Sequence, residues 1–157
     1  MTTWKDVTAF LTSEYAASEL SPGVVRVGLE WPNDGRSHFV DVRHVLEPVP
    51  LIRLNSPIAE IPGSQLESLL QLVGRLPVPL GLARYTGPME NLDLVGITHL
   101  LDLETITGDT LGYFVDLVGE VADSLEYLVT LEDDIVSEQK LVELMKARRI
   151  ARPGSTP

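Results

Sequence analysis

Cysteine is absent from the 157-residue chain. Its absence excludes disulfide bonds, thiolate catalysis and zinc sites built from cysteine. Long apolar runs are missing too, because no stretch of the sequence approaches the ~18–20 continuous apolar residues that a membrane-spanning helix needs. The N-terminal residues Met1–Asp6 do not combine a basic segment with a following apolar run, so they lack the pattern of a secretory signal. We therefore expect a cytoplasmic protein that does not associate with membranes.

Lysine and arginine are absent between Arg84 and Lys140, whereas 13 of the 55 intervening residues are Asp or Glu. Apolar residues recur through the same stretch with a strand and then a helix periodicity, which indicates a folded acidic surface rather than a disordered acidic tail. The formal net charge of the chain is -11. A field of this sign disfavours nucleic acid and anionic lipid and attracts basic partners. We expect a protein or peptide partner and no nucleic acid.

The chain has the length of one domain that can bury its own core. We assign residues 1–131 to the main domain, residues 132–150 to a helical C-terminal extension, and residues 151–157 to a disordered tail. Five of the 12 basic residues lie in the last 18 positions. This basic end either pairs with the acidic surface or adds solubility.

The first third of the chain predicts a helix followed by a hairpin. Thr3 and Asp6 form a capping box for a helix over residues 3–15, with Asp in place of the usual Glu or Gln. Residues 25–31 alternate between apolar and polar, and residues 37–46 resume a strand after a turn cluster rich in Gly, Asn and Asp.

Residues 51–61 predict a third strand that is short, broken or at a sheet edge, because proline cannot donate to a ladder. Ser64 and Glu67 form a capping box that starts a second helix. Residues 79–86 and 92–103 then predict two further strands. The prolines that crowd the third strand are Pro48, Pro50, Pro57 and Pro62.

Residues 108–131 predict the longest helix, and residues 137–149 predict a further one. Gly112 and Gly119 in the long helix either permit close packing or lower its helicity. Its apolar stripe consists of Leu111, Phe114, Val115, Val118, Val121, Leu125 and Leu128. The opposite, solvent-facing side is expected to carry Asp116, Glu120 and Asp123.

No catalytic signature is present, and we expect neither an enzyme nor a metal or cofactor. His38, Asp41 and His44 cannot share one ion, because residues six apart on a strand are ~20 Å apart and Asp41 points to the other face. His99 lies on an apolar strand face, where a core histidine is the simpler interpretation. The alternative hypothesis is an unrecognised enzyme that uses His38, Asp41 or His99.

A resemblance to a known family rests on three segments, namely the two-strand segment Leu80–Leu103, the run Asp109–Leu111 and the run Val115–Leu125. On these residues, and in its small size and acidity, the chain resembles the secretion-chaperone-like fold of type III secretion chaperones and the YbjN family. The predicted elements of the main domain follow the order α-β-β-β-α-β-β-α. The resemblance implies an α+β domain with helices packed on a curved, mainly antiparallel sheet. It also implies a homodimer that binds extended client segments without hydrolysing them.

For such a client we expect an apolar groove that takes alternate client side chains. The candidate groove residues are Trp4, Phe10, Val40 and Val42, although Trp4, like Trp31, is alternatively a core residue. A second hypothesis is a structural or regulatory homodimer without a client. The candidate self-association face, which is alternatively part of the core, consists of Leu66, Leu69, Leu70 and Val73.

Overall fold

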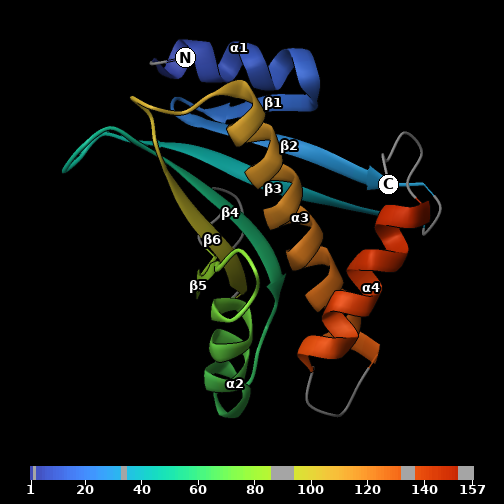
Figure 1. Ribbon diagram of the computed structural model, residues 1–157. Helices are drawn as coiled ribbons and strands as arrows, with labels where there is room; N and C mark the ends of the chain where they lie inside the picture. The colour runs from blue at the N-terminus through green and yellow to red at the C-terminus, as the bar shows by residue number, and fades with distance from the viewer. Residues whose placement is uncertain (2, 33–34, 86–93, 132–136, 152–157) are drawn as a thin grey trace.

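The computed structural model describes residues 1, 3–32, 35–85, 94–131 and 137–151 (Figure 1). These residues form an α+β structure in which helices pack on one six-stranded antiparallel sheet, so the predicted fold class is confirmed. The helices are α1 (Trp4–Glu14), α2 (Gly63–Gly74), α3 (Gly108–Leu131) and α4 (Glu138–Ala151). The strands are β1 (Ala16–Ser21), β2 (Val24–Trp31), β3 (Arg36–Val45), β4 (Leu51–Ala59), β5 (Gly81–Arg84) and β6 (Val95–Asp102).

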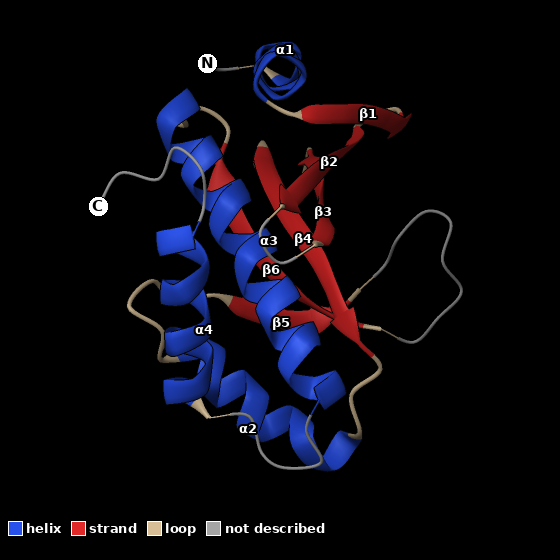
Figure 2. Ribbon diagram, turned by 90° about the vertical axis from the view of Figure 1, so that its right-hand side faces the viewer, coloured by secondary structure: helices blue, strands red, loops and turns tan. Residues whose placement is uncertain are grey.

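The sheet has the strand order β1-β2-β3-β4-β6-β5, with β1 and β5 at its edges. Val27 pairs with Val40 across β2 and β3, and Val42 pairs with Leu54 across β3 and β4. Because strand side chains alternate between faces, these four residues share one face, and all four are fully buried. Figures 1 and 2 show α3 crossing the sheet, with α4 beside it. The core therefore lies between the sheet and α3.

Helix α1 begins with the predicted capping box. The Thr3 hydroxyl accepts the Asp6 N–H at 3.2 Å, and the Asp6 carboxylate accepts the Thr3 N–H at 3.2 Å. Val7 and Leu11 are the fully buried side chains of α1, and the helix lies above β1 in Figure 1. The first helix and the β2–β3 hairpin thus agree with the sequence-based prediction.

The third strand was expected to be short, broken or at a sheet edge. Strand β4 is neither short nor at an edge, and only the irregular pairing with β6 between Pro57 and Ala59 agrees with that expectation. It runs for nine residues between β3 and β6, inside the sheet. Pro48, Pro50 and Pro62 fall outside its bounds, and Pro57 lies where the register with β6 shifts. A single proline at a register shift is compatible with an interior strand, because the shift removes the need for one ladder hydrogen bond.

Two further local features differ from the prediction. Strand β1 was not expected, because Ala16–Ser21 has no alternating large apolar residues and owes its conformation to pairing with β2. Helix α2 begins earlier than predicted, with Pro62 at the N-cap, and no side chain caps it. Ser64 therefore lies inside the helix, and the capping box predicted for Ser64 and Glu67 does not form.

Helix α3 buries its predicted apolar stripe, with Phe114 partly exposed. The acidic side does not face solvent as expected: Asp123 is fully buried and Glu120 is only 3% exposed. The reason is that α3 packs against other elements on more than one side, the sheet and α4 among them. Asp116, nearer the start of α3, remains partly exposed.

Helix α4, in the predicted C-terminal extension, packs on α3. Leu141 and Met145 are buried in the common core, and Leu144 packs against it. Residues 152–157 of the predicted tail lie outside the described residues. Among the described helices, none is both long enough and apolar enough to cross a membrane.

Candidate functional site: an acidic cleft between α1, β2 and α3

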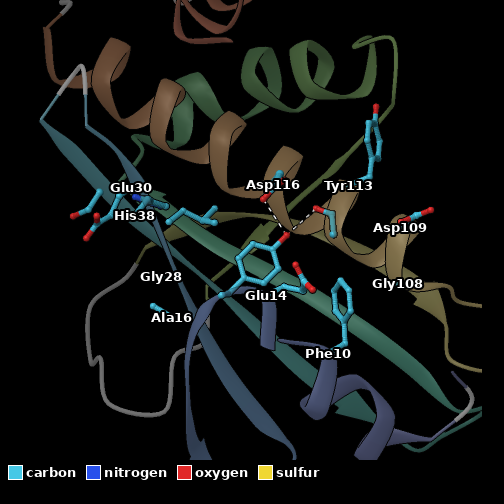
Figure 3. A pocket seen from close by; sticks show the side chains of 14 residues that line it. Phe10, Glu14, Ala16, Gly28, Glu30, His38, Gly108, Asp109, Tyr113 and Asp116 are labelled. Carbon is cyan, nitrogen blue, oxygen red and sulfur yellow. Dashed lines mark hydrogen bonds between the residues drawn. The ribbon is translucent and has the colours of Figure 1, made fainter. Parts of the chain in front are cut away.

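A cleft of about 990 Å³ opens between the C-terminal half of α1, the start of β1, the end of β2 and the N-terminal half of α3 (Figure 3). Its position follows from the fold, because α1 stands over the edge of the sheet and the first turns of α3 run beside it. Gly108 of α3 allows this approach, since an added Cβ would lie 3.0 Å from the Phe10 ring. We call this feature the acidic cleft.

Carboxylates dominate the charge of the acidic cleft. Glu14, Glu30 and Asp109 are exposed along its walls, and none of them pairs with a lysine or arginine that the structure describes. Asp116 lies deeper and accepts a hydrogen bond from the Tyr15 hydroxyl at 3.1 Å. No lysine or arginine is found among the described lining residues. A concave surface with charge of one sign concentrates ions of the opposite sign.

Aromatic rings form the apolar part of the lining. Phe10 and Tyr15 meet edge to face, with ring centroids 6.5 Å apart. The Tyr15 hydroxyl also lies 3.2 Å from the Gly112 carbonyl, so its position is fixed from two directions. Tyr113, on the opposite wall, is about half exposed. Rings next to carboxylates form a surface that suits the apolar stem and charged head of a basic side chain.

The cleft also borders an unpaired strand edge. The register of β1 with β2 ends at Ala16 and Gly28, whereas β2 continues to Trp31. Leu29 and Glu30 therefore lie beyond the stretch that pairs with β1 among the described residues, and both line the cleft. An unpaired edge of this kind can accept an added strand.

A buried ion pair lies close to the β2 end of the cleft. Arg36 of β3 donates two hydrogen bonds to Asp123 of α3, both at 3.0 Å, and one to Glu126 at 3.2 Å. The hydrogen bond to Asp123 is the largest cause that raises the pKa of Arg36. His38, on the same face of β3, approaches the same two carboxylates and also lines the cleft.

The residues of the enzyme hypothesis take part in separate interactions. Asp41 lies on the sheet face opposite His38 and binds Arg26 at 2.8 Å and Tyr85 at 2.5 Å. His99 stacks on Phe114, with centroids 4.2 Å apart, and burial lowers its pKa. The structure thus does not unite Asp41, His38 and His99 in one pocket.

The four candidate groove residues are split between the surface and the core. Phe10 lines the acidic cleft. Trp4 is partly buried and stacks on His44, with ring centroids 5.2 Å apart. Val40 and Val42 are fully buried beneath α3, so they are core residues and do not line a surface groove. Trp31 is buried as well.

The candidate self-association residues are split in the same way. Leu69 and Val73 are buried in the core, so they are not available at the surface. Leu66 and Leu70 line a second groove of about 440 Å³ between α2 and β5, and Leu70 is 50% exposed. Apolar residues dominate this second groove, which also contains Leu82 of the edge strand β5.

Glu14, Tyr15, Glu30 and Asp109 were not identified from the sequence as site residues. The stretch without lysine and arginine drew attention to the part of the chain that contains Asp109, but Glu14 and Glu30 lie outside it. These residues come from different elements, and only the packing of α1 against α3 brings them together.

Comparisons of this chain with protein-family models, with curated proteins and with solved structures gave no match. The function of the acidic cleft is therefore inferred from its own residues.

Proposed function

We propose that the protein is a non-enzymatic binding module that acts in the cytoplasm and holds an extended, basic segment of a partner protein in the acidic cleft. The observation that carries this proposal is the charge of the lining. Four carboxylate side chains surround the cleft, and no lysine or arginine is among its described lining residues. Cationic side chains are therefore the complementary ligands. The four acids are Glu14, Glu30, Asp109 and Asp116.

The aromatic rings add selectivity for basic side chains with long apolar stems. A guanidinium or ammonium over the face of Phe10 or Tyr113 gains ~0.5–1 kcal/mol at an exposed site. The stem of the same side chain covers apolar ring surface that is otherwise in water. Arginine fits this combination best, because its planar head both stacks on rings and binds carboxylates through two hydrogen bonds.

The unpaired edge of β2 supplies a binding mode for the backbone of the partner. A segment that adds to β2 at Leu29 and Glu30 forms main-chain hydrogen bonds and directs alternate side chains to the same face. Every second residue of the segment is then directed to one side, where a basic residue meets Glu30 or Glu14. The resemblance to secretion-chaperone-like proteins, which bind extended client segments, agrees with this mode.

The test is fluorescence anisotropy with labelled peptides that alternate arginine with valine, compared with peptides in which glutamate replaces every arginine. We expect saturable binding of the arginine peptide that weakens as salt is added, and no binding of the glutamate peptide. Glu14→Gln combined with Glu30→Gln should weaken binding, since each exposed charge contributes ~0.2–1 kcal/mol.

A matched control removes the same net charge away from the cleft. Glu47 and Glu104 are exposed and do not line the cleft, so Glu47→Gln combined with Glu104→Gln should leave the affinity unchanged. If both double variants weakened peptide binding equally, the net charge of the protein would explain the binding, and a specific site in the cleft would be contradicted. Equal affinity for the arginine and glutamate peptides would contradict the proposal itself.

A second candidate function is a homodimer formed through the groove between α2 and β5. The observation that favours it is the half-exposed Leu70 beside the short edge strand β5, in a groove lined mainly by apolar residues. A large apolar side chain in such a place is typical of an interface. The mass measured by light scattering separates this dimer from a monomer.

A further inference from the structure

Three side chains with metal-ligating atoms converge between β3 and α3. Asp123 and Glu126, three residues apart on α3, share one side of the helix and face His38 of β3. The His38 Nδ1 atom lies 3.5 Å from Asp123 Oδ1 and 3.8 Å from Glu126 Oε2. One ligand atom from each residue lies within 4.8 Å of the others.

The hydrogen bond formed by His38 Nε2 determines whether His38 Nδ1 can act as a metal ligand. His38 Nε2 lies 2.7 Å from the Pro57 carbonyl oxygen, which can only accept a hydrogen bond. Nε2 therefore carries the proton, and in the neutral ring Nδ1 presents a lone pair to two carboxylate oxygens. The His38 side chain is only 5% exposed. Three electron-pair donors therefore face one another, a geometry that suits a shared cation.

The distances suit a small divalent ion. In a tetrahedral zinc site, zinc–ligand distances of 2.0–2.2 Å place the ligand atoms about 3.4 Å from one another. The two distances from His38 Nδ1, 3.5 Å and 3.8 Å, are close to this value. Metal-binding histidines commonly donate their other N–H to a backbone carbonyl, as His38 does to Pro57.

Arg36 holds both carboxylates in place. It donates to Glu126 Oε1 at 3.2 Å, which leaves Oε2 facing His38. It also donates to Asp123 Oδ1 at 3.0 Å, and this oxygen keeps a second lone pair for an ion. The single positive charge of Arg36 is shared between the carboxylates of Asp123 and Glu126. The Glu126 side chain is 38% exposed, so an ion can reach the cluster from solvent and keep a water in its fourth position.

We propose that His38, Asp123 and Glu126 form a mononuclear site for a divalent transition-metal ion such as zinc, which links β3 to α3. A histidine nitrogen and two carboxylate oxygens are a donor set that zinc accepts. The site does not depend on the proposed peptide binding in the acidic cleft, and either can fail without the other.

The test is a titration of the full chain, first freed of metal with a chelator, with zinc by calorimetry and with cobalt by visible absorption. We expect one ion per chain, a micromolar or lower dissociation constant, and a higher melting temperature with zinc. Glu126→Gln and His38→Gln should each weaken zinc binding at least tenfold. His44→Gln, at a histidine that stacks on Trp4 outside the cluster, should leave it unchanged.

Two results would overturn the site. One is the absence of saturable zinc binding at micromolar concentration, or affinity that persists in Glu126→Gln, a variant of a part-exposed residue that should fold. The other is an NMR spectrum in which His38 carries protons on both ring nitrogens and does not shift with excess zinc. In that case a proton, not a metal, lies between the ring and the two carboxylates.

Discussion

Arg36 and Asp123 lie 87 positions apart in the sequence and form a two-point ion pair in which both hydrogen bonds are 3.0 Å long. Asp123 is fully buried on α3, and Arg36 stands at the start of β3. The pair fixes the contact between the long helix and the strand beneath it. It also explains how an acidic residue can occupy the packed side of α3.

Removing one partner of this pair should be costly. Arg36→Met leaves the Asp123 carboxylate buried without its guanidinium, and we expect the free energy of unfolding to fall by about 3 kcal/mol, the lower end for buried pairs because Arg36 keeps some contact with solvent. Urea denaturation measures this change. The double variant Arg36→Met with Asp123→Leu should lose less than the sum of the two single variants, whereas additive losses would contradict the coupling.

Gly119 should be sensitive to any added side chain. A Cβ there would lie 2.2 Å from Leu29 Cδ1 and 3.0 Å from Val40 Cγ2, inside the core. Overpacking costs about 1–3 kcal/mol, and alanine regains only about 1 kcal/mol of helix propensity. We expect Gly119→Ala to lower the free energy of unfolding by about 1 kcal/mol, measured by urea denaturation.

The control for Gly119 is another helical glycine. A Cβ on Gly74, at the end of α2, meets nothing within 4 Å, so Gly74→Ala should be neutral or stabilising. If Gly119→Ala raised stability as much as Gly74→Ala, the close packing of α3 on β2 and β3 would be contradicted.

His99 should make stability depend on pH. Burial lowers its pKa below the ordinary value, so below about pH 6.5 the unfolded chain takes up a proton that the folded chain resists. The contribution of His99 to stability is therefore complete above about pH 6.5 and decreases as the pH falls below it. In His99→Gln this part of the pH dependence is lost. The measurement is the free energy of unfolding of wild type and His99→Gln by urea denaturation at several pH values. An equal change in the two proteins from neutral to mildly acidic pH would exclude this contribution of His99.

Leu70 should control self-association if the groove between α2 and β5 forms a dimer. Burying a leucine contributes ~1.5–3 kcal/mol, so Leu70→Glu should weaken dimerisation about tenfold or more in light scattering across a concentration series. Leu46→Glu is the matched control, because Leu46 is 68% exposed and does not line the groove. A wild-type protein that stays monomeric at every concentration would reject the dimer.

Much of the fold could be predicted from the sequence because its signals are local. The capping box at Thr3 and Asp6, the alternation in β2 and the apolar stripe of α3 each depend on neighbouring residues, and each is present in the structure. The interior position of β4 could not be predicted, because it depends on pairing with β6, which lies more than 30 residues away in the chain.

The candidate site was predicted much less completely. Phe10 was named, but as part of an apolar groove, and the acids that surround it were not recognised. Val40 and Val42 have the alternation of a half-exposed strand, yet α3 covers them fully. Alternation shows that two residues share a face of the sheet, but it does not show which element covers that face.

By itself the sequence determined the α+β class, most of the elements and the negative charge of the chain. These depend on periodicity, capping and composition, which act over a few residues or over the whole chain. Only the tertiary structure decided where the charges lie. It gathered Glu14, Glu30 and Asp109 around one cleft and buried Asp123 against Arg36, because the environment of a charge is set by residues that are close in space and distant along the chain.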